Sequence, residues 1–196
     1  MNNTVPTRKK HFMGYVLLNN SLSLSITGIF SALICILTMI ISIPVPVTRG
    51  FINIGDAGVM IAGMLFGPII GGIAGGLGSA LADIFLTYTI YAPATLVIKG
   101  LEGFLVGLIA NPKIQSSRLT KRDIISVLVG GSVMVYGYFL YEIFLWGVPG
   151  AVYEFFFNAI IQFGLGAVIA IFFILIIRKN LIESFPQIFN KVFIIE

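Results

Sequence analysis

The chain has 196 residues, of which 58% are hydrophobic and only 10% are charged. An average soluble domain carries about 25% charged residues, so this composition excludes an ordinary soluble enzyme. It predicts an all-α membrane protein whose outer surface is solvated by lipid. The net charge of +4 comes from basic residues in short segments between apolar runs. That placement is typical of membrane topology and argues against nucleic acid as a partner.

Apolar runs divide the chain into about six expected spans in a single domain, because crossing a bilayer takes about 20 apolar residues. Residues 1–20 are interpreted as a cytoplasmic tail and not a signal peptide, since polar residues interrupt the early apolar stretch and no cleavage site follows. The expected spans are residues 22–43, 56–66, 69–86, 92–110, 124–146 and 153–177, followed by a tail at 178–196 on the membrane surface.

Proline and glycine mark the ends of these spans. Pro44 ends the first span, and Gly67-Pro68 divides an apolar block that is too long for one upright helix. Gly147 and Pro149 separate the last two spans. With six spans, the basic segments before the first, between the fourth and fifth, and after the sixth all fall on one side. The positive-inside rule then predicts that both termini are cytoplasmic.

Small residues recur at every fourth position. Gly63, Gly67 and Gly71 form such a row, which lets helix backbones approach closely in lipid and favours internal packing. Gly28 and Ala32 make a similar pair in the first span. Spacing alone leaves open whether that pair packs internally or faces a partner subunit.

Ionisable side chains inside spans are energetically costly and indicate function. The candidates all lie in the outer half of the expected bundle, as a solute pocket open to the outside would require: Asp56, Asp83, Lys99, Glu102, Glu142 and Glu154. Lys99 and Glu102 are three residues apart and share a helix face. Glu154, Asn158 and Gln162 form a polar stripe on the last span. The alternatives are helix caps, a structural ion pair and an interfacial aromatic belt, although Gln162 lies too deep for a cap.

Motifs for catalysis and metal binding are missing from the sequence. It contains no G-x-x-x-x-G-K-[ST] phosphate loop, so the chain is not expected to hydrolyse ATP by that route. The only histidine, His11, lies in the N-terminal tail, which argues against a His-based metal site or a catalytic triad. We therefore expect neither an enzyme nor a resident cofactor or metal.

The stretch from Gly50 to Gly107 resembles the substrate-binding (S) components of energy-coupling factor (ECF) transporters. The resemblance rests on the sequences GFINIGDAGVMIAGMLFGPIIGGIAGGLGSALADIF and YAPATLVIKGLEGFLVG. It is strongest to the subgroup for hydroxymethylpyrimidine or vitamin B6 uptake, near the riboflavin-type members. The resemblance implies a prokaryotic cytoplasmic-membrane protein that captures a vitamin outside. It would then dock on a transmembrane coupling subunit, the T component, and two ATPase subunits.

The resemblance also implies roles for two parts of the chain. Gly28 and Ala32 would form the docking face, with Gly in place of the family's usual first Ala, and the loop 47–53 would close over the ligand. We expect Lys99 and Glu102 to fix polar groups of a hydroxymethylpyrimidine or pyridoxine-like ligand, with riboflavin or another vitamin as the alternative. The expected substrate-binding residues are Asn53, Asp56, Asp83, Tyr91, Lys99, Glu102, Tyr141, Glu142, Asn158 and Gln162. A stand-alone carrier or channel and a structural membrane subunit are the hypotheses from other classes.

Overall fold

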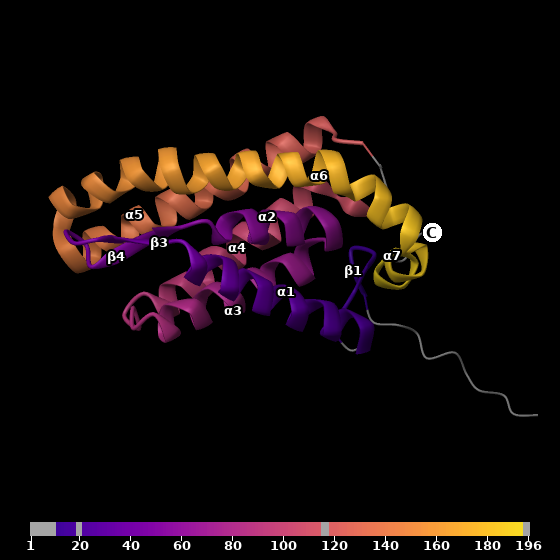
Figure 1. Ribbon diagram of the computed structural model, residues 1–196, viewed down its shortest axis with the longest axis horizontal. Helices are drawn as coiled ribbons and strands as arrows, with labels where there is room; N and C mark the ends of the chain where they lie inside the picture. The colour runs from indigo at the N-terminus through magenta and orange to yellow at the C-terminus, as the bar shows by residue number, and fades with distance from the viewer. Residues whose placement is uncertain (1–10, 19–20, 115–117, 194–196) are drawn as a thin grey trace, which may run out of the picture.

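The computed structural model describes residues 11–18, 21–114 and 118–193, and most of them are helical (Figure 1). The helices are α1 (Ser21–Ile40), α2 (Gly55–Phe66), α3 (Pro68–Phe85), α4 (Ala92–Ala110), the short η1 (Pro112–Ile114), α5 (Lys121–Phe157), the π-helix η2 (Asn158–Phe163), α6 (Gly164–Ser184) and α7 (Pro186–Val192). Two small hairpins complete the fold: β1 (His11–Phe12) with β2 (Tyr15–Val16), and β3 (Ser42–Val45) with β4 (Gly50–Asn53). The predicted all-α membrane architecture is confirmed.

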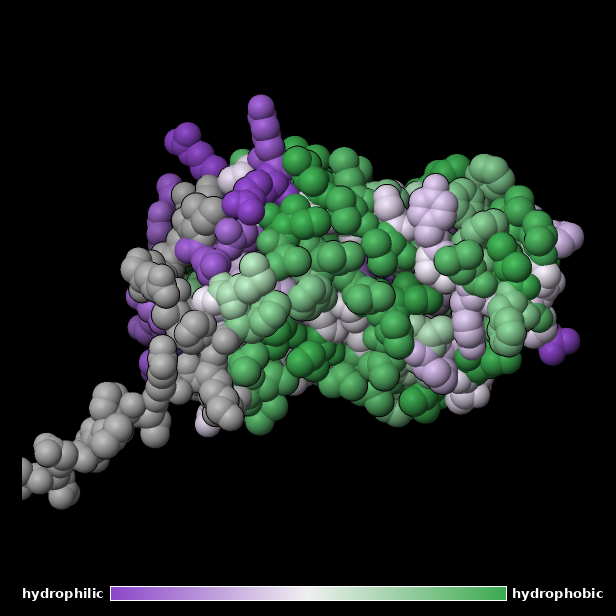
Figure 2. Space-filling view, turned by 180° about the vertical axis from the view of Figure 1, so that it is seen from behind, coloured by the Kyte–Doolittle hydropathy of each residue, from purple (hydrophilic) through white to green (hydrophobic). Residues whose placement is uncertain are grey.

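Within the described residues, four helical stretches are long and apolar enough to cross a membrane: Ser21–Ile40, Pro68–Phe85, Ala92–Ala110 and Lys121–Ser184. The last stretch reverses direction at Gly147, whose φ of 79° and ψ of 171° are not helical. Arg178 Nη2 therefore lies 2.7 Å from Asp123 Oδ1, although 55 residues separate the two in sequence. Together with the shorter α2, this arrangement gives six membrane segments. Figure 2 shows the belt of hydrophobic side chains that they present to lipid.

Some helix limits differ from those expected. Helix α1 ends at Ile40 and not at residue 43, because Ser42–Val45 pairs with Gly50–Asn53 as an antiparallel hairpin. The last segment is helical directly after Gly147, so it begins before residue 153. It also continues to Ser184, beyond residue 177, because Arg178 is buried and paired instead of lying at the membrane surface.

Glycines allow α2, α3 and α4 to pack with their backbones in contact. Gly67 has a φ of 86° and separates α2 from α3, at the point where the sequence predicts a break. A Cβ on Gly103 would lie 2.2 Å from the carbonyl oxygen of Gly71, and one on Gly107 would lie 2.3 Å from the carbonyl carbon of Gly67. Real Cβ atoms do not approach backbone so closely. The row of small residues is therefore a helix-packing seam inside this chain.

Both ends of the described chain lie at the same end of the bundle. Tyr15 pairs with Phe193 as an isolated β-bridge, and its hydroxyl donates to Asn111 Oδ1 at 2.9 Å. Burial raises the pKa of the Tyr15 phenol, so this group remains a donor. Hydrophilic side chains gather at this end (Figure 2), which also carries α7 (Figure 1). The positive-inside rule predicts that this end faces the cytoplasm, which would place the β3–β4 hairpin at the outer face.

Candidate substrate-binding site

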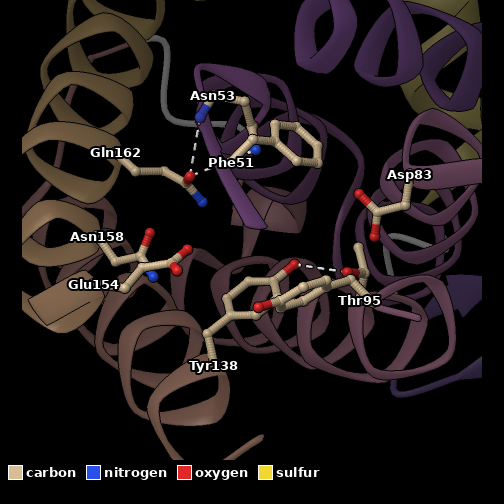
Figure 3. Close-up of a pocket in the computed structure, with 9 residues that line it drawn as sticks. Phe51, Asn53, Asp83, Thr95, Tyr138, Glu154, Asn158 and Gln162 are labelled. Carbon is tan, nitrogen blue, oxygen red and sulfur yellow. Dashed lines mark hydrogen bonds between the residues drawn. The ribbon is translucent and has the colours of Figure 1, made fainter. Parts of the chain in front are cut away.

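A polar cavity of about 20 Å³ lies at the outer end of the bundle, beneath the β3–β4 hairpin. It is lined by Phe51, Asn53, Asp83, Tyr91, Thr95, Tyr138, Glu154, Asn158 and Gln162. Figure 3 shows these side chains converging from β4, α3, α4, α5 and η2. Such a volume holds about one water molecule. A ring-sized solute can therefore enter only when part of the wall moves.

The hairpin at residues 42–53, which we call the lid, is fastened to the bundle by buried hydrogen bonds. Thr48 at its turn donates its hydroxyl proton to the Glu154 carboxylate. The Thr48 carbonyl accepts from the hydroxyl of Tyr91 at 2.7 Å, and that hydroxyl accepts from Trp146 Nε1 at 3.1 Å. The turn of the lid is thus held by Tyr91, which precedes α4, and by Glu154, which follows Gly147. Trp146, which precedes Gly147, joins this network through its hydrogen bond to Tyr91.

The base of the lid is held by an amide pair. Gln162 Oε1 accepts from the backbone N–H of Asn53 at 3.0 Å, and Asn53 Oδ1 accepts from the backbone N–H of Gly55 at 2.8 Å. Phe51 packs its ring against Tyr88, with the centroids 4.5 Å apart. Movement of β4 would therefore change both the polar contacts at the base of the lid and the aromatic wall of the cavity.

The opposite wall carries two hydroxyl groups beside a carboxylate. Tyr138 donates to Thr95 Oγ1 at 2.9 Å, and Asp83 lies next to Thr95 on this wall. Asp83 is only 3% exposed, and its Oδ2 has no hydrogen-bond partner. The Asp83 carboxylate points into the space between the labelled residues (Figure 3). This wall therefore offers a buried acceptor that no donor in the described part of the chain satisfies.

A second polar cluster lies behind Tyr138 and does not line the cavity. Lys99 forms ion pairs with Asp56 and with Glu102, the latter at 3.3 Å between Nζ and Oε2. All three side chains are essentially inaccessible. The Lys99 ammonium also lies 5.7 Å from the centre of the Tyr138 ring. This arrangement matches a structural ion pair that links α2 to α4.

Comparison with known proteins identifies the family. The family model described as "ECF-type riboflavin transporter, S component" matches residues 19–185. The chain belongs to this family. It is therefore a multi-pass membrane component of a vitamin transporter and not an enzyme, as the sequence predicts.

Similarity to individual relatives agrees with this assignment. A Pyrococcus woesei protein described as "Uncharacterized protein in gap 3'region" is 40% identical over 69% of this chain and 88% of its own length. A "UPF0397 protein" of Streptococcus agalactiae is 31% identical over 64% of this chain and 71% of its own. The "Thiamine precursor transporter HmpT" of Lactococcus lactis is 29% identical over 86% of this chain and 95% of its own.

Half of the residues expected to bind substrate in this S component lie on the cavity wall, namely Asn53, Asp83, Tyr91, Asn158 and Gln162. The other half do not line it. Asp56, Lys99 and Glu102 form the buried cluster. Tyr141 donates to the carbonyl of Ile90 at 2.5 Å, outside the cavity. Glu142 is buried beside Glu154, with both of its carboxylate oxygens unpartnered.

Four wall residues were not among those expected: Phe51, Thr95, Tyr138 and Glu154. Phe51 lies in the loop 47–53 that was expected to close over the ligand, and Glu154 belongs to the polar stripe of the last span. Thr95 was missed entirely. It lies four residues before Lys99 and therefore on the same helix face, and this spacing was the available signal.

The small residues of the first span lie on the open side of α1. Gly28 and Ala32 are both exposed, and a Cβ on Gly28 would meet nothing within 4 Å. Leu24 and Ile29 beside them are also exposed. Internal packing, one of the two interpretations left open by the sequence, is therefore excluded for Gly28 within the described chain. The S component presents this face to lipid or to a partner.

Proposed function

We propose that this S component captures a single-ring thiamine precursor of the hydroxymethylpyrimidine type at the outer face of the membrane. The observation that carries the proposal is the polar, aromatic-walled cavity beneath the fastened lid, opposite the two ends of the described chain. Aromatic walls with a few converging polar groups are typical of sites for small ring compounds. The similarity to a relative described as a thiamine precursor transporter supports the same ligand.

Riboflavin is the second candidate, and the description of the matching family favours it. The size of the cavity argues the other way. Because the cavity holds only about 20 Å³, a three-ring flavin would have to displace Phe51 and Tyr138 much further than a pyrimidine or pyridine would. A single ring needs the lid to move but leaves the helical walls nearly in place.

The proposed ligand contacts are the residues of the cavity wall. Phe51 and Tyr138 would stack on or flank the ring, while Asn53, Asn158 and Gln162 would exchange hydrogen bonds with its substituents. For Lys99 we propose a structural role in place of the ligand contact expected from the sequence, because its ammonium is already paired with two carboxylates.

Transport requires partners in this proposal. The exposed face around Gly28 and Ala32 would dock on the T component, since small residues let a partner helix approach closely. Two ATPase subunits would supply the energy, because this chain has no phosphate loop.

The test is equilibrium binding of a vitamin panel to the purified protein, followed by uptake into liposomes with and without the coupling subunits. We expect the hydroxymethylpyrimidine to bind, and uptake to occur only with the complete complex and ATP. Absence of binding by any vitamin would refute the proposed function. Uptake by this chain alone would instead establish a stand-alone carrier.

The docking face has its own test. Gly28→Leu and Ala32→Leu should abolish uptake by the complete complex while leaving vitamin affinity unchanged, because both positions lie away from the cavity. Ser132→Leu is the matched control, since Ser132 is exposed on α5 at another face of the bundle. Normal uptake by both α1 variants would place docking elsewhere.

A further inference from the structure

The cavity is acidic, and within the described chain no basic side chain lines it. Asp83 and Glu154 both contribute to the wall, and Glu142 lies buried beside Glu154. The remaining lining groups are aromatic rings, amides and a hydroxyl. Any ligand therefore meets carboxylates from two sides of the cavity and no countercharge.

The nearest cations do not pair with the acids of the cavity. Lys99 is shared between the carboxylates of Asp56 and Glu102. The guanidinium of Arg49 stacks on the Trp146 ring, 5.3 Å from its centre, and is not among the groups that line the cavity. Because the site is shielded from water, a buried polar group without a partner acts strongly on a bound ligand.

The two acids of the cavity wall differ in whether their oxygens have hydrogen-bond partners. Asp83 Oδ2 is buried and has no hydrogen-bond partner among the described residues. Glu154 accepts from the lid through Thr48. A buried acceptor without a donor is unfavourable, and a ligand donor would relieve that cost. In Figure 3, Asp83 lies on one side of the space and Glu154 on the other, with Phe51 and Tyr138 between them.

We propose that this site selects a flat heteroaromatic ring that carries an amino group or a protonated ring nitrogen directed at Asp83, and that it rejects phosphorylated and carboxylated forms. This inference rests on the proposed function and narrows its ligand class. An aminopyrimidine presents N–H donors to the free Asp83 oxygen. Its oxo analogue presents a carbonyl acceptor instead, and a phosphate ester brings nearly two negative charges toward the carboxylates.

The first measurement uses the unmodified protein and three probes: 4-amino-5-hydroxymethyl-2-methylpyrimidine, the same ring with a 4-oxo group, and the monophosphate of the amino compound. We expect the oxo and phosphate probes to bind at least about 100-fold more weakly, because sites that require a donor reject analogues lacking it. Equal or tighter binding of either analogue would overturn the inference. Tighter binding of riboflavin or a carboxylated vitamin would also overturn it, while leaving vitamin capture intact.

The second measurement assigns the selectivity to Asp83. Asp83→Asn preserves shape but adds a donor, so the preference for the amino probe over the oxo probe should shrink at least about tenfold, as the oxo carbonyl gains a partner. The matched control is Glu183→Gln, an exposed acid near the cytoplasmic end of α6, which should leave the ratio unchanged. An unaltered ratio in folded Asp83→Asn would refute the role of Asp83. If that variant does not fold, the probe ratio of the unmodified protein decides the proposal.

Discussion

Tyr91 holds the lid tip closed, and Tyr91→Phe removes only its hydroxyl. That oxygen donates to the Thr48 carbonyl at 2.7 Å and accepts from Trp146 Nε1 at 3.1 Å, so the variant deprives two groups of a partner. Of these two bonds, only that to Thr48 joins Tyr91 to the lid, since Trp146 can keep its bond to Tyr91 when the lid is open. A buried hydrogen bond contributes about 1 kcal/mol net, so the closed lid should lose about 1 kcal/mol relative to the open lid. Each 1.4 kcal/mol is a factor of ten, which predicts roughly fivefold faster vitamin release.

Stopped-flow displacement of bound vitamin by excess competitor measures this release rate directly. Tyr136→Phe is the matched control, because Tyr136 is 59% exposed on α5 and does not line the cavity. Its release rate should equal that of the unmodified protein. A release rate within about twofold of normal in Tyr91→Phe would mean that opening of the lid tip does not limit release, and the reasoning on the lid would be wrong.

Three further predictions concern stability. Gly103→Ala should cost about 2–3 kcal/mol and lower the apparent Tm by about 4–12 °C, because the new Cβ meets backbone, whereas Gly28→Ala should not destabilise. Lys99→Met strands two buried carboxylates, so it should destabilise by about 3–5 kcal/mol while the vitamin affinity of the folded fraction stays within a few-fold. Arg178→Met should destabilise similarly by leaving Asp123 unpaired, and adding Asp123→Asn should restore most of the loss.

Thermal unfolding in detergent, monitored by tryptophan fluorescence, checks all three predictions, and binding isotherms complete the second. An unchanged Tm in Gly103→Ala would show that the helix seam can relax. A large loss of vitamin affinity in folded Lys99→Met would show that Lys99 contributes to ligand binding. No recovery in the double variant would mean that Arg178 acts through its contact with the Met64 carbonyl and not through the carboxylate.

Local patterns in the sequence predict the fold well because membrane helices obey strong local rules. Gly67-Pro68 marks the break between α2 and α3, since glycine adopts the positive φ and proline starts the next helix. The i+4 stripe correctly places Asn158 and Gln162 on the cavity wall. Both the helix break and the polar stripe depend on residues that lie close together in the sequence.

The features that the sequence did not predict depend on contacts between segments that are far apart in the chain. Lys99 and Glu102 share a helix face, but only the approach of Asp56 on α2 reveals that they are already paired. Arg178 resembles a surface residue until Asp123 is found opposite it across the turn at Gly147. The early end of α1 likewise depends on the pairing of two strands, which proline spacing alone does not predict.

The π-helix η2 keeps the buried side chains of the last membrane segment facing the inside of the bundle along its whole length. Buried residues follow one another at every fourth position, before η2 at Gly150 and Glu154, within it at Asn158 and Gln162, and after it from Gly166 onward. In a regular α-helix such a row rotates by about 40° at each step. The wider π-turn reverses part of that rotation, so one helix faces the ligand cavity with its first half and α2 with its second. Deleting a single residue from Asn158–Phe163 would turn one half by about 100° against the other, and the chain would lose either its substrate wall or its contact with α2.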